Sequence, residues 1–319
     1  MFRSLVLASA TAALVAVAPS SALAASPPGV STGGASKVTS TSAHVSGAIN
    51  PRGQGTTYSF QYGTTTNYGG STPVASAGAG TKAITVGADL GGLQGAKTYH
   101  YRLVASSPGG VVSGSDRTFK TDKVPLSLSL VATPDPVRYG AAVTLGGTLA
   151  GTGGGGQTVQ LQLNPFPYTG GFMNAAISPV VTGGAGNFTM VLAGLTANAQ
   201  ARVVTKTGKA VTSPTIMLGV SPVVRTAVST RHPRRGRFVR FAGTVSPSFV
   251  PAQVAIQRLS SKGAWITVAG NVTRAYKADR SRYAKSARVR SAGTYRVFVG
   301  LLNSQFAGAV GPSIRISPR

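Results

Sequence analysis

The sequence contains no cysteine and no glutamate, and its acidic side chains are five aspartates among 319 residues. The absence of cysteine excludes disulfides, thiolate nucleophiles and cysteine-ligated metals. Because small secreted domains often depend on disulfides, each domain here must instead bury a core of its own, which favours domains of about 100 residues. The shortage of carboxylates removes most of the side chains that acid–base catalysis uses.

Long hydrophobic runs are also scarce. An apolar run extends from Leu5 to Val17 and is shorter than the ~20 residues that span a bilayer. Arg3 precedes this run and the small residues Ala22-Leu23-Ala24 follow it, which is the three-part layout of a secretory signal peptide. We therefore expect residues 1–24 to be a signal peptide. The mature chain should lack a membrane span and be secreted or held at the cell surface or cell wall.

The composition favours strands over helices. Glycine and proline are abundant, at 42 and 19 residues, and no window after the signal shows the 3.6-residue periodicity of an amphipathic helix. Alternation of apolar and polar residues is instead clear in Thr57–Tyr62 and Thr98–Val104, and turn residues follow each run. Short alternating runs of this kind are typical of β-sandwiches, so we predict an all-β chain of tandem β-sandwich domains.

Residues 25–122 carry five segments that match one family. These segments are Thr39–Ala43, Gly47–Gly53, Phe60–Gly69, Leu93–Tyr101 and Arg117–Thr121. Together they resemble a fibronectin type III domain of bacterial exported proteins. The resemblance implies that Tyr99, six residues after Leu93, is a structural tyrosine corner whose hydroxyl bonds to the backbone just upstream. The tryptophan common in an early strand of the family is missing and Gly47 stands near its place, so Phe60 and Tyr101 should fill the core there.

Residues 123–221 and 222–319 resemble each other at offsets of 94 to 98 residues. The matching pairs include Gly140–Leu149 with Gly236–Val245, Val159–Gln162 with Val254–Gln257, and Arg202-Val203 with Arg296-Val297. A nearly constant offset over several anchors indicates two diverged copies of one repeat. Both copies resemble the Ig-like modules of bacterial surface proteins. We therefore predict a fibronectin type III-like domain at 25–122, an Ig-like sandwich at 123–221 and a basic Ig-like sandwich at 222–319.

The positive charge is concentrated in the third predicted domain. The chain has a formal net charge of +26, and residues 222–319 carry eighteen lysines and arginines against Asp279 alone. Such a charge density attracts polyanions, although it can also serve only to keep a surface solvated. The candidate anion-binding residues form one group near the start of a strand and another that shares one parity along a strand. They are Arg231, Arg234, Arg235, Arg237, Arg240, Arg280, Arg282, Arg288 and Arg290.

The partners expected for such a surface are anionic cell-wall or extracellular polymers. Arginine outnumbers lysine, and its guanidinium fork suits phosphate and carboxylate. Nucleic acid is disfavoured: Tyr276, Tyr283, Tyr295 and Phe298 are the aromatic residues that could stack on bases, but core positions of a β-sandwich explain most of them. An exported, non-catalytic structural or adhesion protein, attached through its basic third domain, is the function that these features favour.

The sequence favours two other classes of function less. The scattered aspartates and the three histidines, His44, His100 and His232, show no catalytic or metal-ligand spacing, so we expect no enzyme activity, no metal and no cofactor. A polysaccharide-binding accessory module could use exposed rings in the loops that hold Tyr168 and Trp265. The offset of 93 residues between Phe172 and Trp265 instead predicts that both are equivalent core positions.

Overall fold

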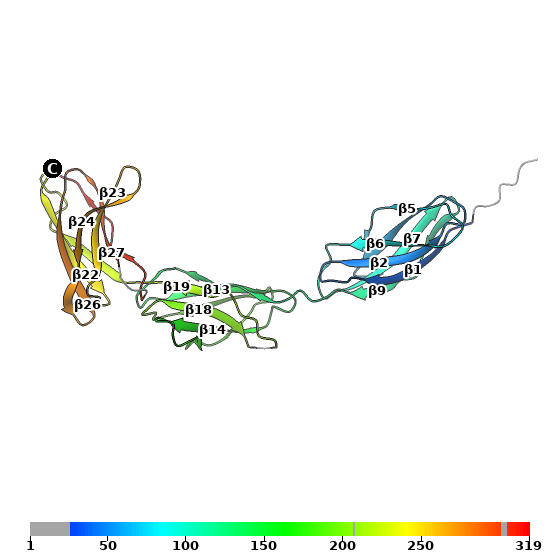
Figure 1. The fold of residues 1–319 in the computed structure, drawn as a ribbon, viewed down its shortest axis with the longest axis horizontal. Coiled ribbons are helices and arrows are strands. Elements are labelled where there is room, and N and C mark those ends of the chain that lie inside the picture. The colour runs from blue at the N-terminus through cyan, green and yellow to red at the C-terminus, as the bar shows by residue number, and fades with distance from the viewer. Residues whose placement is uncertain (1–25, 207, 301–304) are drawn as a thin grey trace, which may run out of the picture. The chain divides into compact units, whose positions relative to one another are not determined.

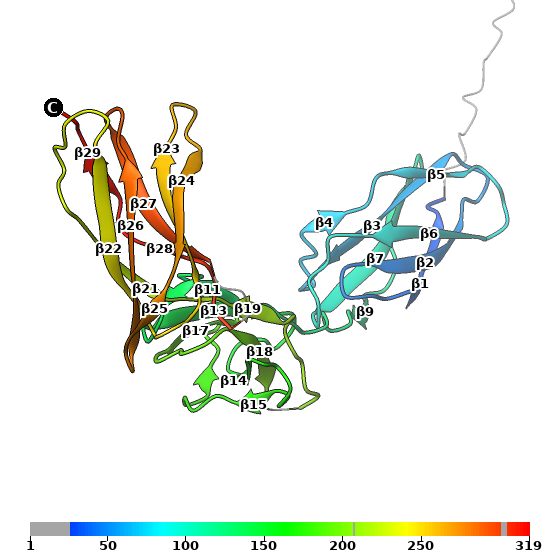
Figure 2. The ribbon, with the colours of Figure 1, turned by 60° about the vertical axis from the view of Figure 1, so that its left-hand side comes forward.

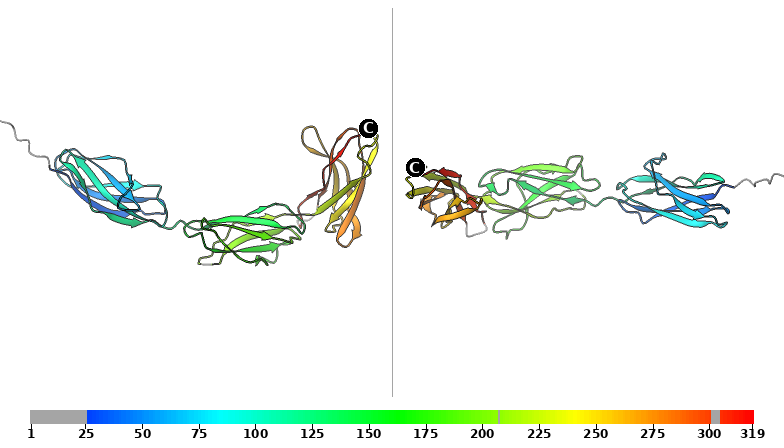
Figure 3. Two further views of the ribbon diagram at one scale, coloured as in Figure 1. Left: turned by 180° about the vertical axis from the view of Figure 1, so that it is seen from behind. Right: turned by 90° about the horizontal axis from the view of Figure 1, so that it is seen from above.

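The computed structural model describes residues 26–206, 208–300 and 305–319. The predicted signal peptide at residues 1–24 lies outside the described residues. Within them the chain forms strands and turns but no helix, which confirms the all-β prediction (Figure 1; Figure 3). The chain divides into two compact units, Met1–Lys123 and Val124–Arg319. The first unit holds one hydrophobic core, and the second holds two.

The first unit is a β-sandwich of two antiparallel sheets. One sheet has the order β1-β2-β6, and in the other β3 and β7 form the centre, flanked by β4, β5, β8 and β9. The strand bounds are β1 Gly29–Ser36, β2 Ala43–Asn50, β3 Thr56–Gly63, β4 Gly70–Ser71, β5 Ala75–Gly78, β6 Ile84–Leu90, β7 Thr98–Ser107, β8 Gly110–Ser113 and β9 Arg117–Lys120.

The period of two residues in these strands separates core from solvent. Along β2 every second residue is buried, among them Val45 and Ile49. Phe60 from β3 and Tyr101 from β7 face them from the opposite sheet and are fully buried. Both rings therefore lie in the core of the first sandwich, as the sequence predicts.

A second sandwich occupies the first half of the second unit. Its sheets are β10/β11-β13-β17 and β15/β16-β14-β18-β19, and a short parallel pair joins β12 to β20. The bounds are β10 Ser127–Leu128, β11 Val131–Thr133, β12 Val137–Arg138, β13 Val143–Ala150, β14 Thr158–Pro165, β15 Met173–Asn174, β16 Val180–Val181, β17 Asn187–Leu192, β18 Ala199–Thr205, β19 Ile216–Leu218 and β20 Val220–Ser221.

The third sandwich has the sheets β21-β22-β26-β25 and β24-β23-β27-β28, with β29 also pairing with β27 (Figure 2). The bounds are β21 Val223–Val228, β22 Phe238–Ser246, β23 Gln253–Leu259, β24 Trp265–Val272, β25 Arg274–Lys277, β26 Arg280–Arg288, β27 Gly293–Gly300, β28 Ala309–Val310 and β29 Ile314–Ile316. The chain passes from one sheet to the other at Thr273, between β24 and β25.

One glycine recurs at the same place in all three sandwiches. Gly47, Gly147 and Gly243 lie in the central strands β2, β13 and β22. A Cβ at any of them would clash with a core side chain and with a carbonyl oxygen of the adjoining edge segment, which is β1, the link between β10 and β11, or β21. Only glycine lets the edge strand approach so closely. The equivalence of Gly47 to the other two extends the internal similarity from the last two sandwiches to the first.

The second and third sandwiches share packed side chains. Phe306 follows β27 in the chain but belongs to the core of the second sandwich, where its ring lies 6.2 Å from those of Tyr139 and Phe249. Two backbone hydrogen bonds flank it: the Asn198 N–H donates to Gln305 and the Ala307 N–H to Val220. These contacts tie the third sandwich to the second within one compact unit.

Candidate anion-binding surface of the third sandwich

Six of the predicted arginines gather where β22 begins and β26 ends. We call this group the arginine end; it consists of Arg231, Arg234, Arg235, Arg237, Arg288 and Arg290, all of them exposed. The loop is held by backbone hydrogen bonds between Gly236 and Val289 at 2.7 Å and between Val289 and Arg237 at 3.0 Å. Gly236 has a φ of 78°, which allows the tight turn into β22. The backbone thus brings the two sequence groups together.

Two side-chain contacts fix part of the arginine end. The Arg235 Nε donates to the carbonyl of Arg290 at 3.0 Å, and the Arg288 Nε donates to the carbonyl of Gly236 at 2.9 Å. Both contacts use Nε and a neutral carbonyl, so they leave the guanidinium charge unbalanced. The remaining N–H groups of each guanidinium stay available to an anion.

Arg240 and Arg282 lie elsewhere, on the outer face of the sheet β21-β22-β26-β25. Val239 and Phe241 are buried on either side of Arg240, and Ser281 and Tyr283 on either side of Arg282, so the arginines point outward. They line an open groove of about 670 Å³ together with Arg274. Sequence reasoning missed Arg274, which lies in β25 directly opposite Arg282.

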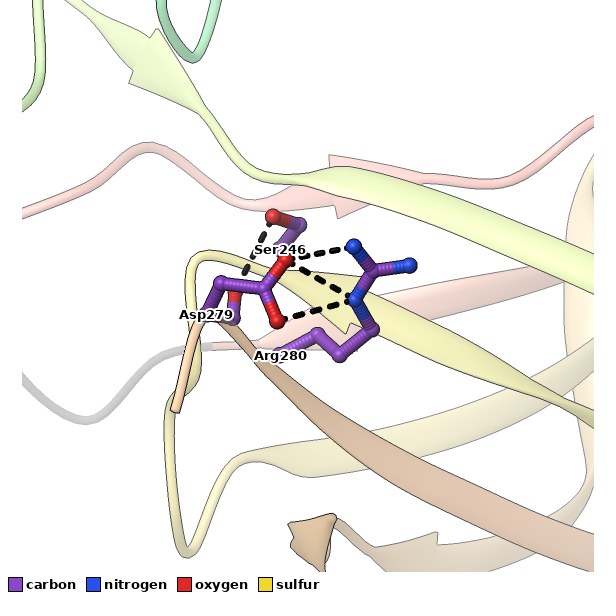
Figure 4. A network of polar contacts seen from close by, with 3 residues as sticks. All are labelled: Ser246, Asp279 and Arg280. Carbon is purple, nitrogen blue, oxygen red and sulfur yellow. Dashed lines mark hydrogen bonds and ion pairs between the residues drawn. The ribbon is translucent and has the colours of Figure 1, made fainter. Parts of the chain in front are cut away.

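Arg280 is the predicted arginine that has a carboxylate partner. The Asp279 carboxylate accepts its Nε–H at 3.0 Å, and the Ser246 hydroxyl donates to the Asp279 backbone carbonyl at 3.0 Å (Figure 4). The hydrogen bond from Arg280 lowers the pKa of Asp279. Asp279 is the only carboxylate side chain in residues 222–319. The other candidate arginines therefore have no carboxylate side chain within their own sandwich to pair with.

Tyr99 lies in β7 of the first sandwich. Its phenol oxygen accepts the backbone N–H of Gln94 at 2.9 Å, and its ring stacks on Phe119 at 5.7 Å. The hydrogen bond spans five residues, from the turn before β7 to the strand itself. Tyr99 therefore acts on the fold of the first sandwich.

A glutamine, an arginine and an aromatic ring recur on the outer face of each sandwich. In each case the arginine Nε donates to a glutamine directly opposite on the neighbouring strand, and its guanidinium lies 4.1–4.6 Å from the ring centroid. The three sets are Gln61, Arg102 and Tyr68; Gln162, Arg202 and Phe172; and Gln257, Arg296 and Trp265. Because weakly and strongly basic sandwiches share it, the arrangement is a property of the fold.

This arrangement corrects the prediction for Phe172 and Trp265. Both were expected in the core, yet neither belongs to a core cluster, and both are only half-buried. Their repeat equivalence is real, but it reflects the stacked arginine rather than core packing. Arg296 occupies one face of Trp265, so that face cannot stack against a sugar ring.

Other polar clusters are small. In the first sandwich the Asp116 carboxylate joins His100 at 2.8 Å and the Tyr68 hydroxyl at 2.9 Å. The hydrogen bond from His100 is the main reason that the pKa of Asp116 is lowered. Among residues 26–206, 208–300 and 305–319 there is no group of three or more histidine and aspartate side chains that could hold a metal ion. The same part of the chain has no helix long and apolar enough to cross a membrane.

Comparison with known proteins gives no family model and no curated protein that matches the chain. Solved structures do resemble it. A tetra-tandem repeat from the extending region of a large adhesion protein is 15% identical and covers 91% of this chain and 74% of its own, with a TM-score of 0.28. The FN1–FN3 domains of chicken CNTN1 are 13% identical over 92% of this chain and 99% of theirs, with a TM-score of 0.31.

Domains A168-A170 from titin are 12% identical over 92% of this chain and 99% of theirs, with a TM-score of 0.36. At these identities and TM-scores the likeness says nothing about the function. The strand topology itself shows that the chain is a tandem array of β-sandwiches.

Proposed function

We propose that the chain is an exported, non-catalytic structural or adhesion protein whose third sandwich binds anionic polymers of a bacterial cell wall or extracellular matrix. The tandem sandwiches serve as spacers, and the basic sandwich serves as the attachment point. The N-terminal sequence, with its signal-like layout, supports export. The resemblance of the first sandwich to domains of bacterial exported proteins supports the bacterial setting.

One observation carries this proposal. Residues 222–319 contain eighteen cationic side chains and only one aspartate, Asp279, whose carboxylate accepts a hydrogen bond from Arg280. Charge of one sign repels itself and lowers stability, whereas a polyanion would offset that repulsion. The first two sandwiches are also built mainly from two antiparallel sheets but lack the excess charge, so a β-sandwich does not require it.

The test measures binding of the full mature chain to purified bacterial cell walls by co-sedimentation over a salt series. Affinity should fall by ~100-fold or more between about 50 and 200 mM salt, because several counterions are released together. The test variant replaces Arg231, Arg234, Arg235 and Arg237 with glutamine. Substitution is preferable to removing the third sandwich, because Phe306 supports the core of the second.

A matched control removes four exposed cations from the first sandwich instead: Lys37, Arg52, Lys82 and Lys120, each replaced by glutamine. Both variants lose the same net charge. Only the variant with glutamine in the third sandwich should bind cell walls more weakly than the unchanged chain. Equal loss in both variants would show that total charge matters rather than this surface, and binding that ignores salt would rule out electrostatic attachment.

A further inference from the structure

The groove on the third sandwich contains two arginines that directly oppose each other. Arg274 of β25 is the antiparallel partner of Arg282 of β26, so their Cα atoms lie about 5 Å apart and both side chains leave the same face. Both are exposed. Like charges directly opposite on neighbouring strands are destabilising. The sandwich therefore tolerates a local repulsion that its own carboxylate, held by Arg280, does not relieve.

The floor and walls of the groove suit a chain-like ligand. Ala242 and Ala284 are strand partners, and their small side chains form a low floor between the arginines. Thr244 of β22 is the strand partner of Arg282, and Arg240 lies four residues before Thr244 on the same strand. The groove therefore has an arginine at each end, about 14 Å apart along the strand. The Asn271 side-chain amide donates to the Ala284 carbonyl at 2.7 Å and closes the edge.

Tyr276 provides an apolar surface beside the two arginines. Its ring is 51% exposed, and the guanidinium of Arg282 lies 5.6 Å from the ring centroid. Trp265 differs, because the guanidinium of Arg296 lies only 4.1 Å from its ring centroid and covers that face. The longer distance at Tyr276 leaves its ring less covered. An aromatic ring beside charged groups can pack against the apolar face of a sugar.

The number of guanidinium groups in the groove determines which anion fits it best. A carboxylate has two oxygens, and one guanidinium saturates it in a bidentate pair. A phosphate monoester has three terminal oxygens and about −1.5 to −2 charges at neutral pH, which two guanidiniums can match in both geometry and charge. We infer that the groove binds a phosphate monoester group of a polysaccharide between Arg274 and Arg282, with the adjoining sugar on Tyr276.

This inference rests on the proposed function, since it names the ligand group within the same sandwich, but it fails separately. The experiment titrates the full mature chain by calorimetry with a short oligosaccharide that bears one phosphate monoester. Matched oligosaccharides bear one sulfate, one carboxylate or no charge. The phosphorylated sugar should bind at least tenfold more tightly than the others. Its affinity should fall as the pH drops below about 6, where the second phosphate proton binds.

The variants Arg274→Gln and Arg282→Gln should each weaken binding of the phosphorylated sugar tenfold or more. Arg274→Gln should not lower the melting temperature, because it removes a repulsion, so a mere folding defect is distinguishable. Arg282→Lys keeps the charge but loses the fork, and should lose the preference for phosphate over carboxylate. The fourfold glutamine variant of the arginine end should leave this binding within about twofold.

Equal affinity for the carboxylated or sulfated sugar, or no effect of Arg274→Gln and Arg282→Gln, would overturn the inference. If cell-wall binding still depended on the arginine end, the proposed function would survive that result. If the chain bound neither cell walls nor the oligosaccharide, both would be wrong.

Discussion

Replacing Phe306 with alanine should destabilise the second sandwich, although the residue follows β27 of the third. Phe306 is 6% exposed and packs with the buried residues of the second core. Truncating a buried phenylalanine costs about 3–5 kcal/mol, and we expect the lower end because the site lies at the edge of that core. At roughly 2–4 °C per kcal/mol for a unit of this size, the melting temperature should fall by about 6–12 °C.

The assay is hydrogen exchange measured strand by strand in the full mature chain. Phe306→Ala should lower the protection of β13 and β18, which belong to the second sandwich. Phe238→Ala is the matched control: it removes a phenylalanine of the third sandwich that is 66% exposed and should change little. Unchanged protection in β13 and β18, with loss confined to the third sandwich, would refute the shared packing.

Two further predictions concern single positions, and a third concerns a pair of side chains. Burial raises the pKa of Tyr283 from 10.0 to about 12. The stability that the protonated Tyr283 contributes is therefore complete below pH 10 and is lost as the pH rises through about 12. Alkaline unfolding curves of Tyr283→Phe should lack that part of the pH dependence. Gly243→Ala should cost about 1–3 kcal/mol of unfolding free energy from overpacking, measured by denaturant unfolding, whereas Gly270→Ala should be nearly neutral. A double-mutant cycle of Trp265→Ala and Arg296→Gln should give a coupling of about 0.5–1 kcal/mol; zero coupling would contradict the stacking.

The sequence carries the strand pattern well, because period-two alternation is a direct consequence of strand geometry. The alternation in Tyr295, Val297 and Val299 appears as buried residues of β27. The offset between the last two sandwiches likewise agrees with the pairs of equivalent strands, such as β14 and β23. Both signals are local or repeated, so they survive without any knowledge of the tertiary structure.

The stacked rings illustrate what the sequence hides. Tyr68, Phe172 and Trp265 follow their paired glutamines by seven, ten and eight residues, because the connecting segments differ in length. No fixed spacing therefore marks the arrangement. The three arginines are easier to recognise in the sequence, because each precedes an apolar strand residue: Arg102-Leu103, Arg202-Val203 and Arg296-Val297.

The groove was hidden for a different reason. Arg274 follows Thr273, where the chain changes sheets, and the alternation of β24 does not carry across that change. Only the register of β25 on β26 places Arg274 opposite Arg282. The place of Phe306 was equally hidden, because the other buried residues of the core that it joins lie in another sandwich more than 80 residues earlier in the chain.

The central claim is that an anionic polymer binds the third sandwich, and arginine footprinting tests it most directly. The full mature chain is treated with an arginine-specific dicarbonyl reagent, with and without the cell-wall polymer, and the modified peptides are quantified by mass spectrometry. The account predicts that the polymer protects Arg234, Arg237 and Arg282, while the exposed Arg52 and Arg138 of the other sandwiches react as before. Protection of Arg52 and Arg138 instead, or of no arginine while the polymer is bound, would contradict it.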